Sequence, residues 1–209
     1  MKEISTDTTH IRVWDWPVRV FHWSLAICIL IGFVTGESER FSLLHQTLGY
    51  AAVGLLVFRM TWGFIGTRYA RFSQFVKGPG AVLAYLKGMR EGNPPHHIGH
   101  NPVGGIAVLL LMGLVALTGF TGWLISAGDA PGWQEELHEI AANSLILVVL
   151  IHVLGVVLSS RLHRENLVRA MLTGFKRGQA SDGITRSWWG VGLLLGTGLL
   201  GFIASQLLL

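Results

Sequence analysis

The apolar residues of the chain gather into five long runs, which polar and charged segments separate. A helix needs about 20 predominantly apolar residues to cross a lipid bilayer. The runs cover approximately residues 18–35, 43–58 with an extension toward 65, 102–127, 140–160 and 187–209. This pattern predicts an all-α integral membrane protein whose chain crosses the membrane five times.

The composition excludes several other classes of protein. Charged residues make up only 13% of the chain, whereas a soluble domain carries roughly 25%. Disorder is excluded as well, because it combines low hydrophobicity with high charge. The single cysteine, Cys28, rules out an internal disulfide and a cysteine-based metal cluster. No basic segment interleaved with aromatic residues is long enough to indicate nucleic-acid binding.

The distribution of charge predicts the orientation of the chain. When the N-terminus is placed in the cytoplasm, 15 of the 16 Lys and Arg residues fall on the cytoplasmic side, and only Arg40 falls outside. Basic residues favour the cytoplasmic side of a membrane protein, so five crossings put the C-terminus outside. Residues 1–17 contain three acidic residues, which favours a retained cytoplasmic segment over a cleaved signal peptide.

This orientation divides the chain into four predicted parts. They are a cytoplasmic N-terminal segment (1–17), a four-helix core (18–160), a cytoplasmic amphipathic segment (161–186) and a C-terminal transmembrane helix (187–209). Apolar and basic residues alternate from Leu167 to Arg177, which predicts a short amphipathic helix on the anionic inner leaflet. For residues 72–87, a similar helix and a solvated loop remain open.

Four of the nine histidines lie in or at the predicted spans, namely His22, His45, His138 and His152. Ionisable groups inside a membrane are costly and are functional hypotheses by default. The other histidines lie in inner polar segments and are expected to be ordinary surface residues: His10, His96, His97, His100 and His163. Any one of the four could simply donate to a neighbouring backbone carbonyl, so their joint placement carries the argument.

The four histidines fall at two depths. His138 and His152 are 14 residues apart on one predicted helix, which corresponds to about 21 Å along the axis and nearly the same helix face. His22 lies near the inner end of the first span, and His45 lies at the outer start of the second. We therefore expect two pairs, His22 with His152 toward the inside and His45 with His138 toward the outside.

Two imidazoles that face each other across a helical bundle can bind a haem iron from both sides, which favours electron transfer over oxygen chemistry. Zinc would require three or four ligands at one depth, and a proton relay usually includes buried carboxylates. Seven glycines in the spans would leave room for porphyrins, although ordinary small-residue packing explains several of them: Gly32, Gly49, Gly54, Gly113, Gly119, Gly122 and Gly155. The pattern favours a di-haem core.

Three arginines are candidates to bind the anionic propionate groups of such haems. Arg19 and Arg59 lie near the inner pair, and Arg40 lies near the outer pair. The tendency of basic residues to set membrane topology explains each of them equally well.

Several motifs carry a specific resemblance to a known family. They include Arg19-x-x-His22-Trp23, Leu44–Tyr50, Arg59–Phe72, His100–Gly105 and the 14-residue spacing of His138 and His152. Further matching stretches surround His138, His152 and His163. Over about residues 10 to 178 the chain resembles the bacterial cytochrome b561 and nickel–iron-hydrogenase b-type cytochrome family.

The resemblance implies a four-helix di-haem core in the bacterial inner membrane, with ligands at His22, His45, His138 and His152. It implies electron transfer between the quinone pool and a periplasmic partner, either a c-type cytochrome or an enzyme subunit such as a hydrogenase. A superoxide:quinone oxidoreductase and a non-redox membrane anchor are the alternatives. Residues 187–209 lie beyond the core pattern, and the existence of a homo-oligomer stays open.

Overall fold

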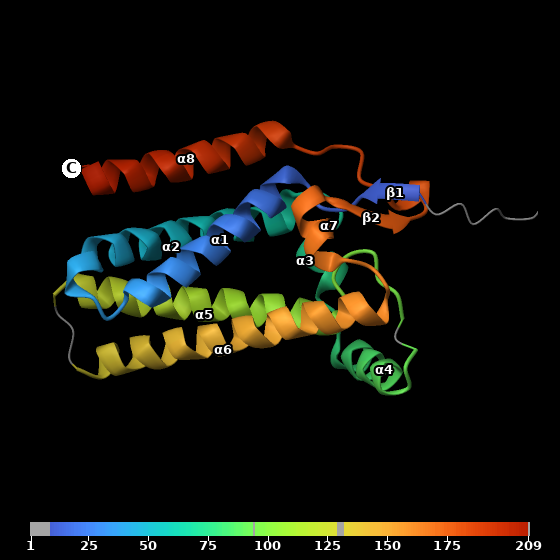
Figure 1. Cartoon of the computed structure of the whole chain (residues 1–209), viewed down its shortest axis with the longest axis horizontal. Coiled ribbons are helices and arrows are strands. Elements are labelled where there is room, and N and C mark those ends of the chain that lie inside the picture. The colour runs from blue at the N-terminus through green and yellow to red at the C-terminus, as the bar shows by residue number, and fades with distance from the viewer. Residues whose placement is uncertain (1–8, 94, 129–131, 209) are drawn as a thin grey trace, which may run out of the picture.

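Five long helices lie side by side in the computed structural model, which describes residues 9–93, 95–128 and 132–208 (Figure 1). They are α1 (Trp16–Thr35), α2 (Ser42–Ile65), α5 (Pro102–Ser126), α6 (Trp133–Leu162) and α8 (Trp189–Leu208). Each is long and apolar enough to cross a membrane. The prediction of an all-α membrane protein with five spanning helices is therefore confirmed.

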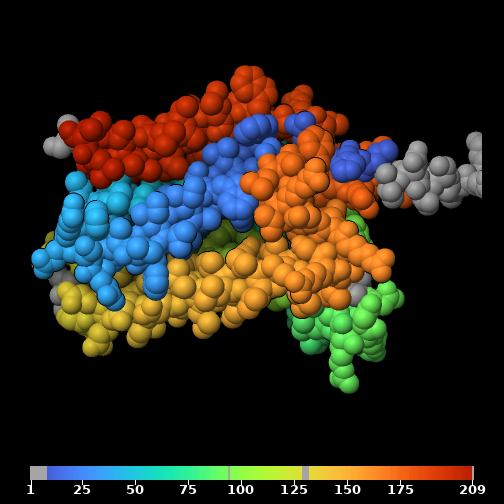
Figure 2. Space-filling view, viewed as in Figure 1, coloured from blue at the N-terminus to red at the C-terminus, as the bar shows by residue number. Residues whose placement is uncertain are grey.

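Four of these helices form a bundle, and α8 lies against its outside. Helix α1 packs on α2, α2 packs on α5, and α5 packs on α6, while α8 contacts α1 and α2. The buried core includes Ala51, Leu55, Val115 and Leu145. Figure 2 shows a hollow between α1 and α6, through which α5 is visible. The packing thus separates the two helices that carry His22 and His152.

Local sequence signals explain where the helices begin. The Asp15 carboxylate accepts a hydrogen bond from the Val18 backbone at 2.8 Å, and Asn101 caps α5 in the same way through Gly104. Pro17 is the second residue of α1 and Pro102 is the first of α5, positions in the first turn where the missing N–H of proline costs little. Helix α6 begins at Trp133, seven residues before the predicted run. Its first turn carries acidic residues, which the positive end of a helix dipole stabilises.

Short elements cover one end of the bundle. They are α3 (Phe72–Phe75), α4 (Pro79–Arg90), α7 (Leu167–Thr173), and the antiparallel strands β1 (Thr9–Arg12) and β2 (Phe175–Gly178). Two single 3₁₀ turns, η1 (Glu39–Phe41) and η2 (Ala180–Asp182), complete the described elements. We call the end that carries α3, α4, α7 and the two strands the basic end, since most lysines and arginines lie there. Helices rather than a solvated loop occupy most of residues 72–90.

The predicted helix from Leu167 to Arg177 is wrong beyond Thr173. Gly174 ends α7 in a left-handed conformation with φ of 88°, and a Cβ atom at this position would lie 2.7 Å from the Trp14 carbonyl oxygen. The chain then continues as β2, which pairs with β1. The N-terminal segment supplies this partner strand from far away in sequence, so a local pattern could not reveal it.

Candidate haem-ligand pairs

His45 of α2 and His138 of α6 face each other near the end of the bundle opposite the basic end. Their ring centroids are 6.1 Å apart. His45 Nδ1 lies 2.8 Å from the carbonyl oxygen of Gly32, and His138 Nδ1 lies 3.0 Å from that of Thr118. A carbonyl oxygen only accepts, so Nδ1 is the donor in both rings and Nε2 keeps its lone pair. Metal-ligating histidines are held in the same way.

Two glycines let the rings of this pair approach the neighbouring backbone. A Cβ atom at Gly122 of α5 would lie 3.1 Å from His138 Cε1. A Cβ atom at Gly36, directly after α1, would lie 3.5 Å from His45 Cε1. Gly122 was expected to make room for a porphyrin, and in the structure it makes room for the side chain of a candidate ligand.

The second predicted pair lies closer to the basic end. His22 follows the first residue of α1, Trp16, by six residues, which is about 9 Å along the axis. Its Nδ1 atom is shielded from solvent and has no hydrogen-bond partner among the described residues. His152 comes from the C-terminal half of α6, ten residues before its end at Leu162. The His22 imidazole is therefore not committed to another protein group and is available as a ligand.

Arg59 lies at the same depth as His22, because it precedes the last residue of α2 by six residues. The side chain is buried, and its Nη2 atom donates to the Ala70 carbonyl oxygen at 3.0 Å. Its Nη1 atom is shielded and has no partner, and no carboxylate of the described residues lies within 4.0 Å of the guanidinium. The Asp15 carboxylate acts on this cation only from a distance, and a buried charge that is not fully paired costs free energy. An anionic ligand would offset that cost.

The other two predicted arginines have different surroundings. Arg19 donates to the carbonyl oxygens of Met171 and Leu172 and so ties α7 to α1. Arg40 lies near the opposite end, with its guanidinium carbon 5.5 Å from the centre of the Phe41 ring. Of the three, Arg59 alone combines burial with an unpartnered donor.

His100 differs from the expected surface residue. Its ring lies between Trp14 and Phe75, with centroid distances of 4.8 and 4.7 Å, and its Nδ1 atom is shielded and unpartnered. Burial and the nearby positive charges of Arg59, His152 and His22 lower the pKa of His100 to about 3. It therefore lies beside the inner pair. Its position in the His100–Gly105 motif was the only sequence signal that pointed to it.

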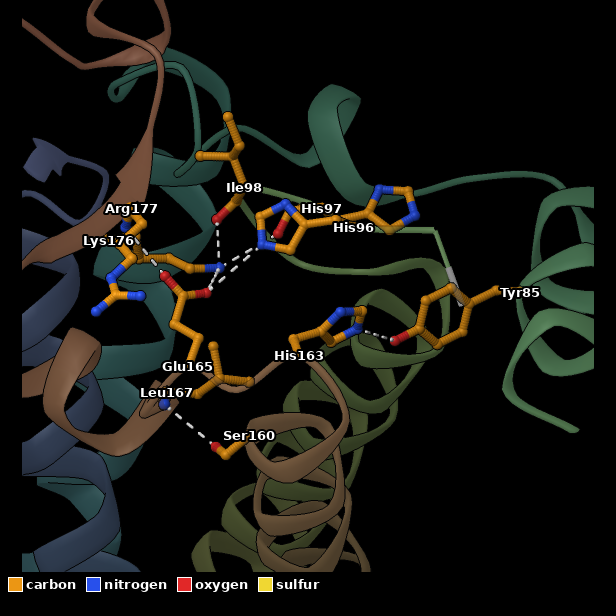
Figure 3. Close-up of polar contacts among 10 residues, drawn as sticks. All are labelled: Tyr85, His96, His97, Ile98, Ser160, His163, Glu165, Leu167, Lys176 and Arg177. Carbon is orange, nitrogen blue, oxygen red and sulfur yellow. Dashed lines mark hydrogen bonds and ion pairs between the residues drawn. The ribbon is translucent and has the colours of Figure 1, made fainter. Parts of the chain in front are cut away.

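His96, His97 and His163 form part of a polar cluster at the basic end (Figure 3), whereas His10 is exposed on β1. Lys176 Nζ forms an ion pair with the carboxylate of Glu165 at 3.0 Å and donates to the carbonyl oxygens of His97 and Ile98. His163 Nε2 lies 3.5 Å from the hydroxyl of Tyr85. No three His, Cys, Asp or Glu side chains in the described part of the chain are arranged to hold a metal ion. The cluster joins α4, β2 and the end of α6.

Comparisons with known proteins support the same family. The family model for prokaryotic cytochrome b561 matches residues 13–174. A probable Ni/Fe-hydrogenase B-type cytochrome subunit of Rhodobacter capsulatus is 24% identical over 216 residues, which cover 80% of this chain and 82% of that protein. A subunit of the same name from Azotobacter vinelandii is 26% identical, with 80% and 89% covered.

A more distant match is the probable Ni/Fe-hydrogenase 1 B-type cytochrome subunit of Escherichia coli K12, 25% identical over 57% of this chain and 63% of that protein. No solved structure matches the chain. The matched residues 13–174 include all four helices of the bundle and both histidine pairs. The chain therefore belongs to the prokaryotic cytochrome b561 family.

Proposed function

We propose that this protein is a di-haem b-type cytochrome that transfers electrons across the bacterial inner membrane, between the quinone pool and a periplasmic redox partner. Membership of the family establishes a membrane b-type cytochrome. The observation that carries the di-haem proposal is the His45–His138 pair, in which both Nδ1 atoms bond to backbone carbonyls. Those bonds leave two Nε2 atoms on facing rings.

We propose that His22 and His152 hold one haem and that His45 and His138 hold the other. Bound haem iron supplies one-electron redox chemistry. The carbonyl oxygens of Gly32 and Thr118 fix the orientation of the outer ligands and raise their basicity. We assign Arg59 to a propionate of the inner haem and Arg40 to one of the outer haem, while Arg19 holds α7 in place at the same end.

The distribution of charge indicates how the chain is oriented in the membrane. The basic end is assigned to the cytoplasm, because lysines and arginines favour that side. This orientation puts the outer pair and the C-terminus of α8 at the periplasmic face. Electrons would then pass between a quinone in the membrane and a partner that docks near the His45–His138 pair.

The relatives indicate the class of partner. They are named as B-type cytochrome subunits of Ni/Fe-hydrogenases, so we propose an enzyme subunit of this kind, with a c-type cytochrome as the other candidate. Quinone reduction by the purified protein, with hydrogenase and hydrogen, a reduced c-type cytochrome or superoxide as the electron donor, distinguishes these partners. Turnover with superoxide alone would support the superoxide:quinone oxidoreductase instead.

The haem assignment is tested with single substitutions in the full-length protein. His22→Ala and His45→Ala should each remove one haem and keep the other, as measured by haem content and by reduced-minus-oxidised absorption spectra. His10→Ala, at an exposed residue of β1, should keep both haems. Absence of a b-type signal in the unsubstituted protein would support a non-redox anchor, and loss of the same haem in both variants would contradict the pairing.

A further inference from the structure

Several shielded side-chain atoms near the inner histidine pair have no hydrogen-bond partner in the described part of the chain. They include His22 Nδ1, Arg59 Nη1 and His100 Nδ1, together with Nε1 of Trp23, whose ring lies 5.1 Å from that of His22. Leaving one such group unpaired costs about 1–3 kcal/mol, and native proteins contain few of them. Their presence in one region indicates that a bound group supplies the missing partners.

The chemistry of two of these atoms defines that group. Arg59 is a buried cation with no carboxylate within 4.0 Å among the described residues, and a guanidinium has only donors. His100 is neutral, since burial and neighbouring positive charge lower its pKa to about 3, and a neutral ring has one N–H to donate. Two donors, one of them charged, match a carboxylate or a phosphate oxygen.

The surroundings hold the His100 ring in place. Phe75 and Trp14, both buried, contact it with centroid distances of 4.7 and 4.8 Å. The Arg59 guanidinium carbon lies 5.9 Å from the centre of the same Phe75 ring. Asn101, the next residue after His100, is fixed by its cap bond of 2.7 Å to the Gly104 backbone. Both donors are therefore positioned by the fold before any ligand binds.

We propose that His100 and Arg59 together bind one carboxylate, a propionate of the haem held by His22 and His152, with His100 donating from Nδ1 and Arg59 from Nη1. The proposal rests on the proposed di-haem function. It makes His100 a positioning residue for the inner haem. This role explains why its Nδ1 atom is buried without a partner among the described residues. A lipid phosphate offers the same oxygen chemistry, and the experiment below separates the two sources.

The test uses the full chain with His45→Ala, which is expected to retain only the inner haem. In that protein, His100→Leu removes the donor and keeps an apolar side chain of moderate size. Without the donor the propionate charge is less well neutralised, which favours the ferric state. The ratio of reduced to oxidised haem at a fixed potential should fall, by at most roughly fivefold, because the full worth of one net hydrogen bond bounds the difference between the two oxidation states. The propionate bending band in resonance Raman spectra should shift.

Matched variants separate hydrogen bonding from general disturbance. His100→Gln restores a side-chain N–H. Its redox potential and its propionate band should therefore lie closer to those of the protein with His100 than the values of His100→Leu do. His10→Gln replaces an exposed histidine of β1 and should change neither. Arg59→Lys keeps the charge but not the fork of donors, so it should shift the band without removing the haem.

Haem dimethyl ester identifies the source of the oxygen atoms, because its propionates are esterified and carry no charge. In protein reconstituted with the ester, His100→Leu should have no further effect on the potential. A persistent effect would point to a phosphate or another group and would overturn the proposal. So would an unchanged potential and Raman band in His100→Leu with native haem. Failure to bind an inner haem at all would instead contradict the proposed function, which is a distinct outcome.

Discussion

The Nδ1 atom of His138 lies 3.0 Å from the carbonyl oxygen of Thr118, a contact that joins α6 to α5 beside a candidate iron ligand. The hydroxyl of Thr121, one turn further along α5, lies 3.1 Å from the same nitrogen. Together with Gly122, these residues determine where the imidazole points. The orientation of the outer pair is therefore sensitive to small substitutions on α5, although neither His45 nor His138 belongs to that helix.

Gly122→Ala should weaken binding of the outer haem. The added methyl group would lie 3.1 Å from His138 Cε1 and force the ring to move by a few tenths of an ångström. Changes next to metal ligands typically lower affinity by about tenfold or more. Haem titration of the purified protein should show weaker outer binding and unchanged inner binding. Gly198→Ala on α8, an exposed position where a Cβ meets no atom within 4 Å, is the control and should bind both haems normally.

Asp15→Ala should destabilise the bundle at the basic end. The buried carboxylate accepts hydrogen bonds from the Val18 backbone, the Trp62 indole and the Thr67 hydroxyl, at 2.7 to 3.0 Å. Losing the acceptor leaves shielded donors unpaired, at about 1–3 kcal/mol each. Unfolding in mixed detergent micelles should show a lower free energy. Asp15→Asn keeps one acceptor, so its free energy of unfolding should lie between those of Asp15→Ala and the unsubstituted protein. Equal stability of all three proteins would contradict this role.

The Lys176–Glu165 ion pair should couple strongly in a double-mutant cycle. Removing one partner of a buried pair costs about 3–5 kcal/mol, so Lys176→Met alone should be strongly destabilising. The combination with Glu165→Gln should be less harmful than the sum of the single changes. Lys87→Met breaks an exposed pair with Glu91 at 3.9 Å and should change the unfolding free energy by about 1 kcal/mol or less. Additive effects at Lys176 and Glu165 would show that the pair is not coupled.

The polar cluster at the basic end predicts a pH dependence of stability. Burial lowers the pKa of His97 and of His163, and the charges of His96 and Lys176 add to this effect, whereas Glu165 opposes it at His163. For a histidine with a lowered folded-state pKa, the unfolded chain binds more protons. Its stabilising contribution is complete above the ordinary value of about 6.5 and is lost as the pH falls.

Thermal unfolding at pH 8 and pH 5.5 should therefore show lower stability at the acidic pH. His163→Gln should reduce the difference between the two pH values, while His10→Gln, on exposed β1, should leave it unchanged. A steeper dependence in His163→Gln would mean that the cluster favours the charged ring.

Gly192→Val should displace α8 from the bundle. A Cβ atom at Gly192 would lie 2.9 Å from Trp16 Cβ and 3.3 Å from the Pro17 nitrogen, a contact too close for a side chain. Because α8 lies outside the four helices that carry the histidines, both haems should remain while the melting temperature falls. Gly198→Val, where a Cβ meets no atom within 4 Å, should melt like the unsubstituted protein. Loss of haem in Gly192→Val would assign α8 to the haem-binding core.

Much of the fold could be predicted because the local apolar composition of a segment determines whether it spans a membrane. A run such as residues 102–127 has little alternative to a spanning helix, and α5 ends within one residue of it. The four histidines can be selected as candidate ligands for the same reason, since a polar group inside an apolar run is costly and conspicuous. The β1–β2 pairing could not be predicted, because it joins residues more than 150 positions apart, whereas Gly174 is a local signal for the end of α7.

The order of residues along the chain establishes the five spans and the separation of His138 from His152 within one helix. Both properties follow from the chain's own periodicity and from the rise of a helix. Only the packed structure reveals that the carbonyl oxygens of Thr118 and Gly32 bond the outer rings, that buried Arg59 keeps an Nη1 atom without a partner among the described residues, and that His100 lies between Trp14 and Phe75. These features arise where separate helices meet, and burial and hydrogen bonding there depend on neighbours that no local pattern contains.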